Sequence, residues 1–115
     1  MPRTRAARAI AAVIGNGITL DEALDRSCGS LEGRDRALAR EIAFGVCRRY
    51  FELDALLAQL MERPLKSRDA DVRALLLVGL YQLRHMRVPD HAAINETVAA
   101  SGQLGKPWAR GLVNA

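Results

Sequence analysis

The chain has 115 residues, of which half are apolar and 26% are charged, and its formal net charge at pH 7 is +4. This balance is typical of an ordinary globular protein. It excludes a membrane span, since no apolar run approaches the roughly 20 residues that a spanning helix needs, and the basic N-terminus lacks the continuous apolar run of a secretory signal. We therefore expect a cytoplasmic protein with one domain over residues 1–115.

Helical periodicity extends through almost the whole sequence, and no segment alternates apolar and polar residues as a strand does. A first helix is predicted near residues 4–14. Arg5 and Arg8 lie on one side of it, and the opposite side carries an apolar stripe of Ala6, Ile10, Val13 and Ile14. Thr19 and Glu22 then have the spacing of a capping box, which predicts a short helix through about Arg26.

A longer helical pattern covers residues 35–62 and ends before Pro64. Its apolar positions recur at spacings of three and four: Leu38, Ile42, Val46, Tyr50, Leu53, Leu57 and Leu60. A straight helix of that length would measure about 42 Å, which exceeds the roughly 35 Å expected for a domain of this size. We therefore expect a bend or break, around residues 50–53.

The most apolar helix is predicted from Asp69 or Asp71 to about Met86, and it is apolar on nearly every side, as expected at the centre of a bundle. Gly79 within it indicates close approach of a neighbouring helix, and Leu76 and Leu80 are expected to lie in the core. After Pro89, a helix capped by residue 90 is predicted to run to about residue 102. The predicted fold is an all-α helical bundle around a central apolar helix.

Catalytic and metal-binding chemistry is not indicated by the sequence. Cys28 and Cys47 are 19 residues apart and lack the paired spacing of a zinc or redox site. His85 and His91 have no further ligand at metal-binding spacing. We expect no metal and, because no strand precedes a glycine-rich turn, no cofactor in this segment.

Positive charge gathers at the two ends of the chain. Residues 1–17 carry Arg3, Arg5 and Arg8 with no acid, and guanidinium groups suit bidentate contact with phosphate. Lys106 and Arg110 are secondary candidates for the same role. The residues alone leave open a merely solvated face. Aromatic stacking is not expected to dominate, since core packing is the more common role for residues beside apolar stripes, here Tyr50, Phe51 and Tyr81.

Several segments resemble the NusB-like RNA-binding domain, in the form that begins bacterial small-subunit ribosomal RNA (cytosine-C5)-methyltransferases. They are RDRALARE (34–41), LDALL (53–57), PLK (64–66), DADVRALLLVGLYQL (69–83) and VPDHAAINETV (88–98). The resemblance implies a NusB-like bundle, and an arginine-bearing first helix that takes part in RNA binding. In the motif INE, Asn95 is expected to bond a loop backbone and Glu96 an arginine.

The resemblance further implies an N-terminal fragment of a longer enzyme, and residues 105–115 indicate a helix cut short. Expected partners are ribosomal RNA and the protein's own C-terminal catalytic domain, which would bind S-adenosylmethionine. One alternative is a stand-alone NusB-type antitermination factor that binds RNA with a ribosomal protein. Another is a helical protein-interaction module without RNA affinity.

Overall fold

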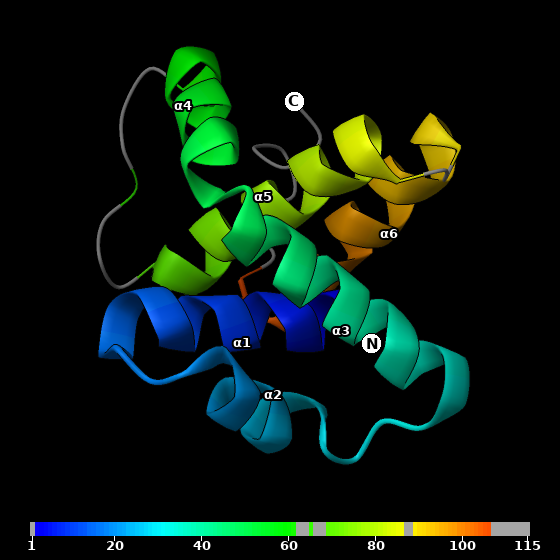
Figure 1. The fold of residues 1–115 in the computed structure, drawn as a ribbon. Helices are drawn as coiled ribbons and strands as arrows, with labels where there is room; N and C mark the ends of the chain where they lie inside the picture. Colours follow the sequence, from blue (N-terminus) through cyan, green and yellow to red (C-terminus); the bar gives the residue numbers. More distant parts are fainter. Residues whose placement is uncertain (1, 62–64, 66–68, 87–88, 107–115) are drawn as a thin grey trace.

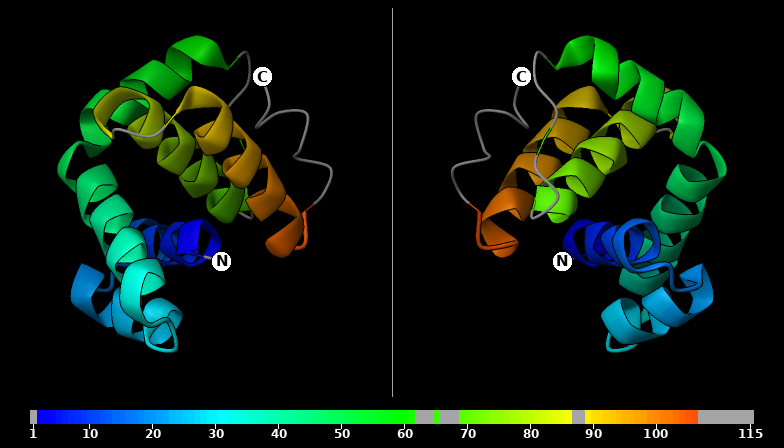
Figure 2. Two further views of the ribbon diagram at one scale, coloured as in Figure 1. Left: turned by 90° about the vertical axis from the view of Figure 1, so that its right-hand side faces the viewer. Right: turned by 90° about the vertical axis from the view of Figure 1, so that its left-hand side faces the viewer.

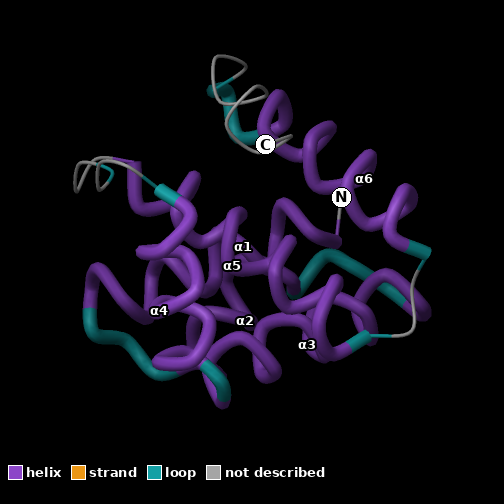
Figure 3. Tube along the Cα trace, turned by 90° about the horizontal axis from the view of Figure 1, so that it is seen from above, coloured by secondary structure: helices purple, strands orange, loops and turns teal. Residues whose placement is uncertain are grey.

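The computed structural model describes residues 2–61, 65, 69–86 and 89–106. Within these ranges the chain forms helices and no strands (Figures 1 and 3), which confirms the all-α prediction. The helices, in chain order, are α1 (Pro2–Asn16), α2 (Leu20–Cys28), α3 (Gly33–Arg48), α4 (Tyr50–Leu60), α5 (Ala70–His85) and α6 (Asp90–Gln103).

The helix boundaries follow the local signals in the sequence. Proline occupies the first position of α1, where its missing N–H is not needed. Gly17 stops that helix with φ of +68°, a conformation that glycine adopts at little cost. Thr19 caps α2 as predicted, because its side chain accepts a hydrogen bond from the Glu22 N–H at 3.2 Å. The Glu22 carboxylate instead pairs with Arg26, at 2.7 Å.

The long helical pattern is divided at Arg49, whose φ of −109° and ψ of 26° lie outside the α-helical range. The break is one residue before the predicted bend. The largest extent of the structure is 35 Å, so an unbroken helix would have projected beyond the bundle. Downstream of the break, α4 points away from α1 and packs against α3 and α5 (Figure 1).

The prediction that residue 90 caps the last helix is wrong. Pro89 is the N-cap of α6 and makes no side-chain cap hydrogen bond, while Asp90 is already the first helical residue. An acid in the first turn still interacts favourably with the positive end of the helix dipole.

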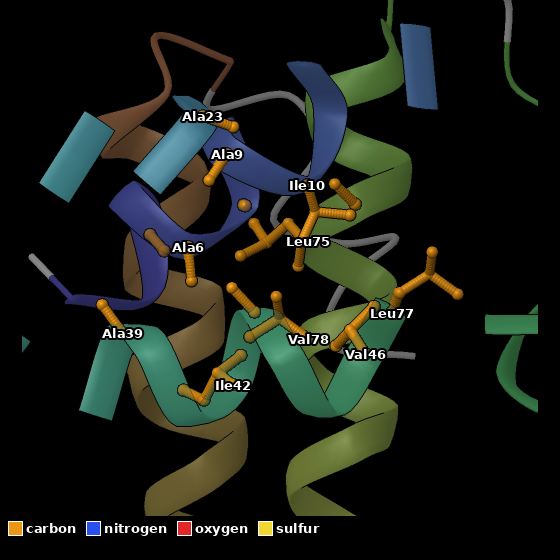
Figure 4. Packing of buried hydrophobic residues seen from close by; sticks show 14 of the residues in the cluster. Ala6, Ala9, Ile10, Ala23, Ala39, Ile42, Val46, Leu75, Leu77 and Val78 are labelled. Atoms are coloured by element: carbon orange, nitrogen blue, oxygen red, sulfur yellow. The ribbon is translucent and has the colours of Figure 1, made fainter. Parts of the chain in front are cut away.

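The predicted central helix is confirmed as α5, which packs against α1, α3, α4 and α6. It shares the centre of the bundle with α1, which lies between α2, α3, α5 and α6 (Figures 1 and 2). The two helices meet where Ile10 lies beside Leu75 (Figure 4), and both side chains are fully buried. Leu76 and Leu80, expected in the core, are only partly buried and pack against it.

Small residues allow this close packing. Ala6, Ala7 and Ala9 are fully buried, so α1 contacts its neighbours on more than the predicted stripe, whereas Ile14 at the end of that stripe is 38% exposed. Gly79 does allow close approach, since a Cβ there would lie 3.3 Å from Thr97 Cγ2 on α6.

Gly45 of α3 is a closer contact that the sequence did not reveal, because an added Cβ would overlap the ring of Tyr81 on α5. Replacing Gly45 by Ala should therefore lower the free energy of unfolding by about 1 kcal/mol or more, since overpacking outweighs the gain in helix propensity. Gly102→Ala is the matched control, because a Cβ there meets nothing within 4 Å. Chemical denaturation measures the free energy of unfolding of both variants. Equal changes in the two variants would contradict the predicted overlap.

Candidate RNA interface

Arg3 points toward α5 and α6. Its Nε–H donates to Gln82 Oε1 at 2.6 Å, and its Nη1 lies 3.9 Å from Glu96 Oε2. The predicted pairing of Glu96 with an arginine is thus present, at the long end of the ion-pair range. Only 14% of the Arg3 side chain is exposed. Its guanidinium joins three helices and is partly neutralised, so it contributes to structure as well as to surface charge.

Arg5 points toward the loop after α2. Its Nη1 donates to the Ser27 carbonyl oxygen at 3.0 Å and to Ser30 Oγ at 3.4 Å. Its Nε atom is buried and has no hydrogen-bond partner among the residues that the structure describes. Since both acceptors are neutral, the positive charge of Arg5 is not compensated by these contacts.

Arg8 is exposed, and its Nη2 donates to the backbone oxygen of Gln103 at 3.2 Å, near the end of α6. The three arginines of α1 therefore have different neighbours: Arg3 lies toward α5 and α6, Arg5 toward the end of α2, and Arg8 toward the end of α6. Arg5 and Arg8 keep their charge without a carboxylate partner in the described part of the chain. A carbonyl hydrogen bond leaves guanidinium donors available for phosphate oxygens.

Lys106 connects the end of the described chain to the start of α5. Its Nζ lies 2.7 Å from Asp71 Oδ1 and 3.1 Å from Asp69 Oδ1. The hydrogen bond to Asp71 is the main cause that raises the pKa of Lys106, and the bond to Asp69 adds to it. A phosphate would compete with two carboxylates for this ammonium group. Arg110, the other secondary candidate, lies outside the described residues.

The two thiols are buried or half-buried, and neither is part of a disulfide. Burial raises the pKa of Cys47. It also raises the pKa of Cys28, against the opposing positive charges of Arg5, Arg40 and Arg36. Within the described ranges, His, Cys, Asp and Glu form no group of three that could hold a metal ion. Every helix described is too short or too polar to cross a membrane.

The aromatic prediction is confirmed in part. Tyr50 and Tyr81 are half-buried and pack against the core. Phe51 was expected beside them but is 86% exposed, because it lies on the side of α4 opposite the buried Leu53 and Leu57.

The arginines of α3 were not among the residues predicted to contact phosphate. The guanidinium carbon of Arg40 lies 5.3 Å from the centre of the Phe44 ring, and Phe44 is 37% exposed. Arg36, Arg40 and Phe44 are four residues apart and so lie along one side of the helix. The four-residue spacing of these side chains is visible in the sequence. However, the apolar positions of the same segment led us to predict only a helix that packs in the core.

Comparison with known proteins gives a consistent result. The chain matches the NusB family over residues 1–115. It is 52% identical to the Ribosomal RNA small subunit methyltransferase B of Pseudomonas putida over 99% of its own length and 26% of the relative. It is 42% identical to that of Vibrio vulnificus (98% and 26%) and 39% identical to that of Escherichia coli O1:K1 (97% and 26%). The chain thus spans about a quarter of the length of these relatives.

Proposed function

Since the chain belongs to the NusB family, we propose that it is the RNA-binding, substrate-recognition domain of a cytoplasmic, S-adenosylmethionine-dependent small-subunit rRNA (cytosine-C5)-methyltransferase. The observation that carries this proposal is the 52% identity to a small-subunit rRNA methyltransferase B over 99% of the chain. A separate C-terminal domain would hold the methyl donor and the catalytic groups.

The geometry supports RNA binding through charge. Arg5 and Arg8 project from α1 toward neutral oxygen atoms, so their charges remain available to a polyanion. Arg3, Lys106 and Arg110 complete the proposed contact set. Arg3 and Lys106 would have to share their donors with Glu96, Asp69 and Asp71. We therefore expect Arg8, the most exposed arginine of α1, to be the clearest single reporter of binding.

The test is a fluorescence-anisotropy titration of the chain with single-stranded segments of small-subunit rRNA at several salt concentrations. Arg8→Ala should stay folded, within about 0.5 kcal/mol of the parent stability. It should bind more weakly, and the slope of log affinity against log salt should become shallower by about 0.7 for the lost phosphate contact. Arg26→Ala is the control, since Arg26 is exposed but paired with Glu22 on α2.

Absence of RNA binding by the parent chain would remove the RNA-binding proposal and favour a protein-interaction module. An equal loss of RNA affinity in the Arg8 and Arg26 variants would mean that net charge alone governs affinity. A stand-alone antitermination factor would require preferential binding of leader RNA over ribosomal RNA, which the titration measures when it is repeated with leader RNA.

A further inference from the structure

A second group of uncompensated positive charge lies where α2 ends and α3 begins. Arg36 is exposed and Arg40 half-buried, and their spacing of four residues places both on one side of α3. Phe44, one turn further along, continues this row. We call Arg36, Arg40 and Phe44 the α3 row. In Figure 1 the helix that carries it crosses in front of α1, on the outside of the bundle.

Arg5 of α1 approaches the same region from the other side. Its Nη1 bonds to Ser27 and Ser30, which flank Cys28 and lie at the end of α2 and in the following loop. The Cys28 thiol lies within the electrostatic influence of all three arginines, since each of their charges opposes the rise in its pKa that burial causes. The guanidinium groups of Arg5 from α1 and of Arg36 and Arg40 from α3 therefore lie near the same end of α2.

These charges differ from those of three other arginines that have carboxylate partners. Arg3 approaches Glu96, Arg26 pairs with Glu22, and Arg73 pairs with Asp54. Among the described residues, no ion pair within 4 Å includes Arg5, Arg36 or Arg40. The acids that neighbour the cluster in sequence are exposed and make no such pair with it: Asp25, Glu32, Asp35 and Glu41. The cluster is therefore able to bind an anion without breaking an internal ion pair.

We propose that Arg5 and the α3 row form a second RNA-contact surface, in which the arginines bind backbone phosphates and a base stacks on the exposed face of Phe44 or on the Arg40 guanidinium. The inference rests on the proposed RNA-binding function and extends it from α1 to α3. Successive phosphates and unstacked bases of a single strand match this arrangement of clustered cations beside an aromatic ring.

An acidic protein segment is the main competing ligand, and Phe44 favours RNA over it. Carboxylates need cations but gain nothing specific from an exposed ring, whereas every base presents a face that can stack. The Arg40 guanidinium, 5.3 Å from the ring centre, shows that one face of the ring accepts a planar group, so a base would stack on the other face or on the guanidinium itself.

The experiment compares two kinds of variant in the same RNA titration. Arg36→Gln with Arg40→Gln should weaken binding and make the salt slope shallower by about 1.4, the value for two phosphate contacts on a single strand. Phe44→Leu should weaken binding about 5- to 150-fold, the equivalent of 1–3 kcal/mol of stacking, and leave the slope unchanged. Circular dichroism should show a parent-like thermal midpoint for each, since Arg36 and Phe44 are exposed, Arg40 is only partly buried, and none of the three belongs to the buried core.

Two controls separate this inference from the proposed function. Arg26→Gln should change neither affinity nor slope, because Arg26 is already paired. If the parent binds RNA and responds to Arg8→Ala while the α3 variants bind as the parent does, the α3 surface is refuted and the proposed function stands. If a polyglutamate peptide binds as tightly as RNA at equal salt and Phe44→Leu has no effect, the surface recognises an acidic protein instead.

Discussion

Replacing Leu75 by Ala should lower the free energy of unfolding by about 2 to 5 kcal/mol. The thermal midpoint should fall on the order of 10 °C in a chain of this size. Leu75 is fully buried where α5 packs on α1, against Ile10. Truncation removes apolar contacts and leaves a cavity that helices on several sides cannot all move to close. Thermal and chemical denaturation monitored by circular dichroism measure both quantities.

Leu83→Ala is the matched control, because it removes the same atoms from the same helix at a position that is 40% exposed. Leu83→Ala should lower the free energy of unfolding by well under half as much as Leu75→Ala does. Similar losses at the two positions would mean that α5 contributes to stability through its helix alone, and not through its packing at the centre of the bundle.

The helices were predictable from the sequence because their determinants are local. Apolar spacing, Thr19 as a cap and Gly17 as a stop each act within a few residues, and they fixed type and approximate bounds. The exact position of the break at Arg49 was not predictable, since no Pro or Gly marks it. The approximate position followed only from a comparison of helix length with domain size. The exposure of Phe51 depends on which side of α4 packs against α3 and α5 after that break, which no local pattern encodes.

The candidate site was predictable in composition and not in geometry. The residue types of the first helix indicated phosphate binding, but the direction of each side chain depends on partners far along the chain. Arg3 bonds to a residue 79 positions away, and Arg8 to one 95 positions away. A helical wheel places Arg5 and Arg8 opposite the apolar stripe, yet Arg5 bonds to residues at the end of α2 and in the following loop, and Arg8 to a residue at the end of α6. The residues of α3 could be assigned to the candidate site only because the structure shows how α1, α2 and α3 pack.

Gln82 illustrates the same limit in the interior of the bundle, since its polar side chain lies within an apolar helical run. It is fully buried on α5 and accepts the Nε–H of Arg3 from α1. Its own amide donates to Thr97 Oγ1 on α6 at 3.0 Å and to the Val78 carbonyl oxygen at 3.2 Å. One amide group therefore satisfies polar groups from three helices, and we expect it to hold them in a single register.

Gln82→Met should accordingly lower the free energy of unfolding by about 2 to 3 kcal/mol, although the side chains are similar in size. The change leaves the Arg3 Nε–H without its acceptor in a largely buried position, and the penalty for an unsatisfied buried donor is larger when the group is charged. Chemical denaturation of Gln82→Met, Arg3→Met and the double variant forms a double-mutant cycle. Because removing both partners leaves no orphaned charge, the double variant should lose clearly less than the sum of the single losses. Additive losses would instead mean that Gln82 and Arg3 stabilise the bundle independently, and that the contact between α1 and α5 depends on apolar packing alone.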